Sequence, residues 1–254
     1  MSCQKYRESR QRAILETWYK DVPNGVKVFF FEGGHENKEM IVGDRIYLSC
    51  GDSYEDQALK TYSVLSFIYT NLDFKYFFKC DDDTYVYPQR LLKCGFEKHD
   101  YMGNLPPGPH WKNGVYAQGG AYFLSKKAIK SILGFPFSNG KGKRWWWGGL
   151  VYRQGNEGPL QSNTTTEDVM VGDILRESGI PLYVDSRLQH DPWPYPYLTT
   201  RQITCHHVSP EEMRKVYLIS KNILLRAYLF LKFNSKALLN KILCMLRASL
   251  NRRE

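Results

Sequence analysis

Three consecutive carboxylates, Asp81, Asp82 and Asp83, directly follow a run of strand-forming residues. The aromatic residues 76–78 favour a buried strand, whereas three adjacent like charges need a counter-ion before they can leave water. Alternate side chains of an extended chain share a face, so Asp81 and Asp83 can converge on one cation while Asp82 faces elsewhere. The pattern predicts a divalent-cation site at the end of a core strand, with a solvated acidic turn as the alternative.

A second pair of carboxylates, Glu167 and Asp168, opens a segment with helical spacing that runs to about residue 178. Acids favour the positive end of a helix, and Thr165 or Thr166 can cap it, so ordinary helix chemistry is one interpretation. The other interpretation is a general base, because a carboxylate held near a metal site can deprotonate a hydroxyl group. The spacing by itself leaves both interpretations open.

Two adjacent histidines, His206 and His207, lie in a segment with strand character. Imidazole nitrogens are common metal ligands, but a single histidine in a strand is more often a hydrogen-bonded core residue. Neighbouring side chains of a strand point to opposite faces. We therefore expect at most one of the two histidines to bind the same ion as Asp83.

Short apolar runs alternate with helical periodicities along the chain, and these must form the elements that position the polar side chains. The predicted helices are residues 6–19, 55–71, 88–96, 126–133 and 166–178, and one more begins after Ser209. The predicted strands are residues 26–31, 46–48, 74–80, 101–103, 181–184 and 203–208, and another follows the paired glycines Gly119 and Gly120. This alternation predicts an α/β fold with a mostly parallel sheet and right-handed crossovers. The paired glycines allow close approach of a ligand or merely of another strand.

The composition favours one large domain with an appendage. The chain has 254 residues, of which 43% are hydrophobic, and can bury a substantial core. Its net charge of +9 comes entirely from residues 213–254, which carry ten Lys or Arg against Glu254 alone. A nucleic-acid-binding interpretation would therefore rest on that tail only. We expect a main domain over residues 1–212 and a basic amphipathic helical tail over residues 213–254.

Two further segments, residues 138–166 and the tail over residues 213–254, contain side chains that can bind a ligand or a surface. The polar stretch 138–166 contains three consecutive tryptophans, residues 145–147, one of which can line an acceptor site or pack in the core. In the tail, apolar triplets alternate with lysines and arginines, as in a basic amphipathic helix. Such a helix can lie on an anionic membrane surface or pack across the main domain with its lysines in solvent.

The cysteines and the apolar runs bear on the setting of the protein. The six cysteines form no Cys-x-x-Cys pair, so we expect mostly free thiols. No apolar run reaches the roughly 18 residues of a spanning helix, and the first residues do not resemble a signal peptide. These patterns predict a soluble or peripheral protein, unless a membrane anchor precedes these residues.

Five motifs in the same order resemble the Fringe-like β-1,3-glycosyltransferases, the family that includes the β-1,3-galactosyltransferases (glycosyltransferase family 31). The resemblance spans roughly residues 7–215. The motifs are an arginine-rich segment ending in Thr-Trp (10–18), Asp-Ser-Tyr with Leu-Lys-Thr (52–54 and 59–61), the acidic motif (79–86), a glycine-aromatic-leucine-serine motif (119–125) and an acidic helix motif (167–172). Their common order and plausible spacing make the resemblance specific.

The resemblance implies a GT-A fold, in which a Rossmann-like mixed sheet flanked by helices binds a nucleotide and continues into an acceptor-binding half. It implies a UDP-sugar donor and Mn²⁺ or Mg²⁺ as cofactor. By the family pattern, Asp83 and Asp81 hold the metal or the nucleotide ribose, and His206 completes the metal site, with His207 as the second choice. A divalent ion bridging both phosphates would stabilise the charge that develops on the leaving group.

The same family pattern implies contacts to the donor and a catalytic base. The implied donor contacts are Arg10, Arg12, Asp52, Lys60, Asp81, Asp82, Gly119 and Gly120. Leu15 stands where many relatives have arginine, which leaves Arg10 and Arg12 as the diphosphate contacts. Asp168 would take the proton of the acceptor hydroxyl during in-line attack on the anomeric carbon, with inversion of configuration, and Glu167 is the second candidate base.

The resemblance thus implies an inverting, metal-dependent glycosyltransferase that moves a hexose, with galactose or N-acetylglucosamine favoured, from a UDP-sugar to a hydroxyl of a glycan or glycolipid, forming a β-1,3 linkage. The alternatives are a non-catalytic glycan- or membrane-binding module on the same fold and a Mg²⁺-dependent phosphoesterase. The cysteine pattern and the lack of an amino-terminal anchor favour the cytoplasm or the cytoplasmic face of a membrane. The Golgi lumen is the alternative if an anchor precedes these residues. We expect no nucleic-acid partner.

Overall fold

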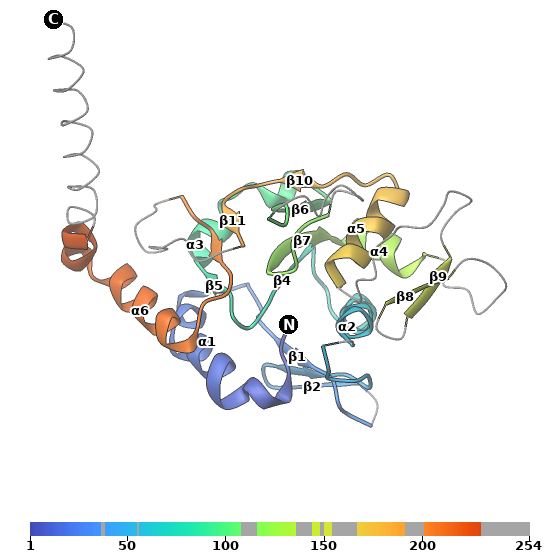
Figure 1. Cartoon of the computed structure of the whole chain (residues 1–254), viewed down its shortest axis with the longest axis horizontal. Coiled ribbons are helices and arrows are strands. Elements are labelled where there is room, and N and C mark those ends of the chain that lie inside the picture. The colour runs from blue at the N-terminus through green and yellow to red at the C-terminus, as the bar shows by residue number, and fades with distance from the viewer. Residues whose placement is uncertain are drawn as a thin grey trace, which may run out of the picture.

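The computed structural model describes residues 1–36, 39–54, 56–107, 116–135, 144–147, 150–153, 167–190 and 201–229 (Figure 1). For residues 144–147 and 150–153 it describes the backbone alone, as the antiparallel strands β8 (Arg144–Trp147) and β9 (Leu150–Arg153). The side chains of the three tryptophans, one of which was expected to line an acceptor site or to pack in the core, therefore lie outside the described part of the chain.

An irregular helical segment and a small sheet form the amino-terminal part of the fold. The segment contains the turns η1 (Gln4–Tyr6), η2 (Arg7–Gln11) and η3 (Trp18–Asp21) and the helix α1 (Arg12–Glu16). The sheet has the order β1-β3-β2, with β1 (Phe30–Glu32) parallel and β2 (Met40–Val42) antiparallel to β3 (Arg45–Tyr47). The helical prediction for residues 6–19 is confirmed in outline. Strand β2 is only three residues long, which is too short to stand out by its periodicity.

The central sheet has the order β10-β6-β7-β4. Its strands are β4 (Tyr76–Cys80), β6 (Tyr101–Gly103), β7 (Ala121–Ser125) and β10 (Tyr183–Val184). Strand β7 runs antiparallel to both β4 and β6, and β10 runs parallel to β6. The predicted mixed α/β fold is confirmed, but the expectation of a mostly parallel sheet is wrong, because strand direction depends on tertiary pairing that local periodicity does not encode.

The register between β4 and β7 creates the site. Cys80 at the end of β4 lies opposite Ala121 at the start of β7, so the acidic triad leaves β4 beside the glycines that precede β7. The backbone N–H of Asp81 donates to the carbonyl of Gly120 at 3.3 Å. The predicted close approach at the paired glycines is thus an approach to the acidic triad.

A third sheet brings the carboxyl-terminal histidines to the same place. It has the order β11-β12-β5, with β12 (Thr204–Cys205) parallel to β11 (Leu188–Gln189) and antiparallel to β5 (Tyr85–Val86). Because Cys205 pairs with Tyr85, the residue after β12 lies next to the chain that follows the acidic triad.

Helices cover these sheets and enclose two main cores. The helices α2 (Gln57–Asn71), α4 (Lys126–Leu133) and α5 (Glu167–Glu177) contact one another and enclose the larger core against the central and amino-terminal sheets (Figure 1). Ser125 caps α4 as predicted, by accepting from the backbone N–H of Ala128. The short helices α3 (Pro88–Leu91) and η4 (Phe96–Lys98) replace the longer helix predicted over residues 88–96.

The last described helix, α6 (Pro210–Lys221), packs against α1 around the second core. It begins with the predicted cap at Ser209, whose side chain and Glu212 form a capping box. Residues 223–229 are also helical, and the rest of the predicted amphipathic tail lies outside the described residues. Within the described ranges, none of the helices has the length and apolar character needed to cross a membrane. The described cysteines, Cys3, Cys50, Cys80, Cys94 and Cys205, are free thiols as predicted.

Candidate active site

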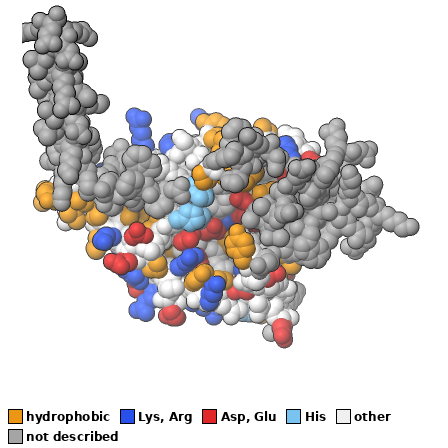
Figure 2. Space-filling model, in the orientation of Figure 1, with side chains coloured by type: hydrophobic (Ala, Val, Ile, Leu, Met, Phe, Trp, Pro, Cys, Tyr) orange, Lys and Arg blue, Asp and Glu red, His pale blue; other side chains and the backbone are white. Residues whose placement is uncertain are grey.

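A pocket of about 490 Å³ opens at the carboxyl end of β4, where the three sheets meet. Figure 2 shows histidine side chains next to acidic and basic ones on this face of the molecule. All the site residues predicted from the sequence line this pocket, except Arg12. They are Arg10, Asp52, Lys60, Asp81, Asp82, Asp83, Gly119, Gly120, Glu167, Asp168 and His206.

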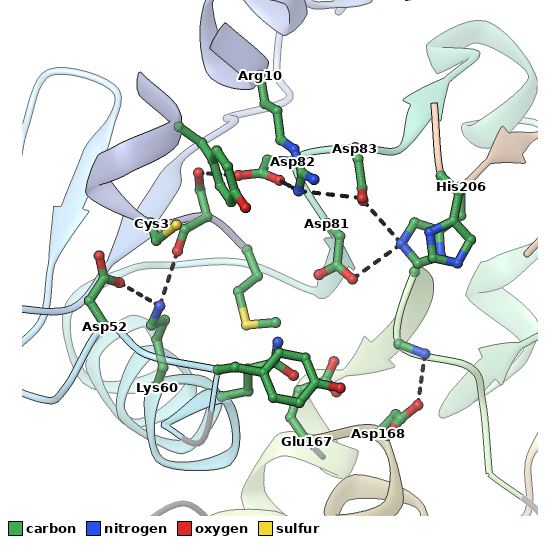
Figure 3. A pocket seen from close by; sticks show the side chains of 18 of the residues that line it. Cys3, Arg10, Asp52, Lys60, Asp81, Asp82, Asp83, Glu167, Asp168 and His206 are labelled. Atoms are coloured by element: carbon green, nitrogen blue, oxygen red, sulfur yellow. Dashed lines mark hydrogen bonds and ion pairs between the residues drawn. The ribbon is translucent and has the colours of Figure 1, made fainter. Parts of the chain in front are cut away.

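Asp81, Asp83 and His206 converge at one end of the pocket (Figure 3). The His206 Nε2 lies 3.0 Å from Asp83 Oδ1 and 3.5 Å from Asp81 Oδ2. Burial raises the pKa of Asp83, but the hydrogen bond from His206 and the nearby His206, Arg10 and His207 side chains together outweigh it, so that pKa is lowered overall. Two carboxylate oxygens and one imidazole nitrogen form a donor set that fits a divalent ion such as Mn²⁺.

Asp82 points away from that cluster, as the alternation predicts. Its Oδ1 accepts from Arg10 Nη1 at 2.8 Å, and its Oδ2 accepts from the hydroxyl of Ser2 at 2.6 Å. The same Arg10 nitrogen lies 3.4 Å from Asp83 Oδ2, and its guanidinium lies over the ring of Tyr6. Asp82 therefore orients a positive charge toward the end of the pocket that holds Asp81, Asp83 and His206.

Lys79 is a site residue that the sequence interpretation missed. Its side chain is fully buried, and its Nζ lies 2.7 Å from Asp81 Oδ1 and 2.5 Å from Glu167 Oε1. It also donates to the carbonyl of Gly119. A signal for this role was present, because Lys79 and Asp81 are two positions apart at the end of a strand and so can share a face.

The carboxylates around Lys79 keep it charged despite its burial. Burial alone would lower the pKa of Lys79, but Asp81 and Glu167 outweigh that effect and raise the pKa above its usual range. For Glu167, burial raises the carboxyl pKa to about 7, against the lowering effect of Lys79. The ammonium group of Lys79 therefore offsets acidic charge next to Asp81, on the interior side of the pocket.

Glu167 and Asp168 open α5 but lie in different surroundings. Glu167 is only 2% exposed and is turned toward Lys79. Asp168 is less buried, and its Oδ2 accepts from the backbone N–H of Gly119 at 3.0 Å. This contact gives the Asp168 carboxylate a defined orientation at the pocket wall, so it is better placed than Glu167 to reach a bound substrate.

Asp52 and Lys60 lie at the end of the pocket opposite the histidines (Figure 3). Lys60 Nζ is 2.5 Å from Asp52 Oδ1 and donates to the carbonyl of Ser2 at 3.1 Å. Asp52 also accepts from the backbone N–H groups of Gln4 and Gly33. This buried pair is fixed by the first turns of α2 and by the loop that follows β3.

Two comparisons with known proteins bear on this site. Residues 9–104 match a family model described as galactosyltransferase. The chain is also similar to the hydroxyproline O-galactosyltransferase GALT2 of Arabidopsis thaliana, with 29% identity over 157 residues. That alignment covers 49% of this chain and 23% of the relative, so the chain spans about a quarter of the length of the curated relative it matches.

The match to the galactosyltransferase family confirms the resemblance read from the five motifs. It contains Arg10, the Asp52–Lys60 pair and the acidic triad, which form one side of the pocket. Asp168 and His206 lie beyond residue 104 and reach the same pocket through the strand pairings described above. The roles given to these individual residues stay predictions.

Arg12 is the one predicted site residue that the structure places elsewhere. Its Nε donates to Glu16 at 2.9 Å, and its side chain is 63% exposed. Residues two apart on a helix point in widely different directions, so Arg10 and Arg12 cannot both face the pocket. Of the two arginines predicted to contact the diphosphate, only Arg10 lines the pocket, and the prediction for Arg12 is wrong.

His207 departs from the geometry expected of a strand. Strand β12 ends at Cys205, and His207 adopts a φ of 58°, so its ring stacks on that of His206 with centroids 3.9 Å apart. The expectation that the two rings point to opposite faces is wrong, because it assumed an extended chain. In the described part of the chain, His206 alone joins the cluster of Asp81 and Asp83.

Gly120 makes room for His206. A Cβ at Gly120 would lie 2.4 Å from the His206 Nδ1, so Gly120→Ala is expected to displace the imidazole. Since this ring faces Asp81 and Asp83, we expect the affinity for Mn²⁺ to fall by about tenfold or more, measured by electron paramagnetic resonance of the free ion. Gly119→Ala is the matched control, because its Cβ would meet only carboxylate oxygens, at 3.3 Å or more. Equal Mn²⁺ affinity in wild type and Gly120→Ala would show that Gly120 does not position His206.

Proposed function

We propose that this chain is a metal-dependent, inverting glycosyltransferase that moves galactose from UDP-galactose to a hydroxyl of a glycan acceptor. The observation that carries the proposal is the convergence of Asp81, Asp83 and His206 on one end of a pocket whose wall also presents Asp168. The match of residues 9–104 to the galactosyltransferase family model supports it. The name of the similar A. thaliana protein favours galactose over N-acetylglucosamine.

The donor diphosphate would lie at the histidine end of the pocket. Asp81, Asp83 and His206 would hold Mn²⁺ or Mg²⁺, which when bound supplies positive charge to the departing diphosphate. Arg10 adds a second positive charge there, since Asp82 holds it 3.4 Å from Asp83. Lys79 contacts Asp81 from the interior of the protein, and its ammonium group balances part of the acidic charge there.

The nucleoside would extend toward the opposite end, where Asp52 and Lys60 form a buried polar pair. Together with Ser53, Tyr54 and Gln57, they offer hydrogen-bonding groups and an aromatic ring to a uridine. The sugar would lie between the two ends, next to Gly119 and Gly120, which also line the pocket.

Asp168 would serve as the general base. Its carboxylate would accept the proton of the acceptor hydroxyl while that oxygen attacks the anomeric carbon from the side opposite the diphosphate, which inverts the configuration. Glu167 is turned toward Lys79 and would instead hold that lysine in place. A β-1,3 linkage, a membrane-bound tail and a cytoplasmic setting stay predictions from the sequence.

The test measures UDP release from a panel of UDP-sugars with Mn²⁺ and after its removal with EDTA. We expect release from UDP-galactose to require the metal, and Asp83→Asn to weaken Mn²⁺ binding by about tenfold or more because a charged ligand is lost. Asp73→Asn is the control, since Asp73 is fully exposed on the surface. Release that EDTA and Asp83→Asn both leave unchanged would refute the metal-dependent mechanism.

A further inference from the structure

Three histidines gather beside the cluster of Asp81 and Asp83. They are His190, His206 and His207, and one ring nitrogen of each lies within 4.8 Å of the others. The ring centroid of His190 lies 5.3 Å from that of His206 and 4.8 Å from that of His207. All three line the pocket.

Backbone pairing places these rings together. Strands β11 and β12 run parallel with Gln189 opposite Cys205, so the residues that follow, His190 and His206, leave the sheet side by side. The left-handed backbone at His207 then turns its ring back onto His206. A hydrogen bond of 2.9 Å from the backbone N–H of Val208 to the carbonyl of Asp83 holds this turn against the acidic triad.

The chemistry of this histidine cluster differs from that of its neighbour. Three imidazoles form a donor set of borderline softness, which suits Zn²⁺, Ni²⁺ or Cu²⁺. The neighbouring set of two carboxylates and one imidazole is harder and suits Mn²⁺ or Mg²⁺. The two sets therefore differ in the metal they prefer, although both contain His206.

His206 can serve one set at a time. Its Nδ1 is buried against Gly120, where even a Cβ would come within 2.4 Å, which leaves no room for an ion on that side. Its Nε2 faces Asp83 and Asp81 at 3.0 and 3.5 Å (Figure 3). One nitrogen lone pair binds one metal ion, so an ion held by the three histidines withdraws a ligand from the acidic set.

We propose that His190, His206 and His207 form a second metal site, selective for Zn²⁺ or a similar late transition-metal ion, whose occupation competes with Mn²⁺ for His206. Binding of Zn²⁺ at this site stands independently of any catalytic activity. Its inhibitory effect rests on the function proposed above. The site is then inhibitory, since an ion held by the three histidines withdraws His206 from the acidic set.

The binding test uses the full chain and Zn²⁺ alone, in competition with a chromogenic chelator. We expect His190→Ala and His207→Asn each to weaken Zn²⁺ binding by about tenfold or more, because each removes one of three ligands. Asparagine is chosen at position 207 because it tolerates a positive φ better than alanine. His35→Ala is the matched control, since the ring of His35 makes an edge-to-face contact with Tyr47 and His35 is not among the residues lining the pocket.

The competition test measures Mn²⁺ affinity in the same variants. We expect His190→Ala and His207→Asn to keep the Mn²⁺ affinity of the wild type, and Zn²⁺ to displace Mn²⁺ from the wild type at lower concentration than from either variant. Zn²⁺ binding that is equal in all variants would overturn the proposal. So would a loss of Mn²⁺ affinity in His207→Asn as large as the loss of Zn²⁺ affinity, because one ion would then use both ligand sets. Zn²⁺ binding lost in these variants, in a protein that releases no UDP, would support the histidine site and refute the proposed function alone.

Discussion

Asp168→Asn is expected to lower the rate of galactose transfer by about 10²–10⁴-fold, while the affinity for UDP-galactose stays close to that of the wild type. Asparagine has nearly the same shape as aspartate, and its carbonyl oxygen can still accept the hydrogen bond from the Gly119 N–H. It cannot accept a proton from the acceptor hydroxyl at neutral pH. The loss should therefore appear in kcat, measured by UDP release, and be absent from the donor Kd measured by titration calorimetry.

Glu167→Gln separates the two candidate bases. Glu167 is buried against Lys79, so its replacement is expected to lower the stability of the fold as well as the activity. Asp168→Asn, at a less buried position, should lower activity with little change in stability. Wild-type turnover in Asp168→Asn together with a folded but inactive Glu167→Gln would transfer the role of base to Glu167.

Lys79→Met is expected to produce the largest loss of stability in this site, about 3–5 kcal/mol in the free energy of unfolding. Methionine fills a similar volume, but it leaves Asp81 and Glu167 without the cation that lies 2.7 and 2.5 Å from them. Buried carboxylates that lose their counter-ion either stay charged, at a cost in desolvation free energy, or take up protons. Chemical denaturation of the metal-free chain measures the effect directly.

A matched control and a rescue make this prediction specific. Lys75→Met removes a lysine just before the same strand, but Lys75 is exposed, so we expect its effect to be within about 0.5 kcal/mol. Lys79→Met combined with Glu167→Gln removes one of the stranded charges and should recover part of the loss. If Lys79→Met were as stable as the wild type, or if the double variant were less stable than expected from adding the two single effects, Lys79 would not be the counter-ion of these carboxylates.

These predictions describe one connected charge arrangement. Asp81 contacts His206 in the pocket and Lys79 in the interior. Lys79 continues the connection to Glu167, which precedes Asp168 in the first turn of α5. A change at Asp81 can therefore reach the candidate base through two ion pairs and one peptide unit.

Local features of this protein were predictable from the sequence because they depend on neighbours in the chain. Ser125 and Ser209 cap helices because their side chains reach backbone N–H groups three residues ahead. The aromatic run before Asp81 predicted a strand that ends at the acidic triad, and β4 ends there. Most site residues were found in the same way, since each belongs to a short motif whose residue types state their chemistry.

Tertiary structure decided which of these residues meet, since that depends on contacts between distant parts of the chain. Strand direction in the central sheet, which the sequence interpretation had as mostly parallel, follows from the pairing of β7 with β4 and β6. Lys79 joins Glu167 across 88 positions, which no local pattern indicates. Arg12 was predicted beside Arg10, but the helix turns it to solvent.

The acidic triad has both kinds of feature, those predictable from neighbours in the chain and those decided by tertiary contacts. Its sequence alone determined that a buried strand ends in three carboxylates and that something positive must offset them. The fold supplied the positive groups, Arg10 for Asp82 and Lys79 for Asp81, and placed His206 opposite Asp83. The left-handed turn that stacks His207 on His206 was likewise settled by the fold, because it depends on the contact of Val208 with Asp83 and not on the residues around it in the sequence.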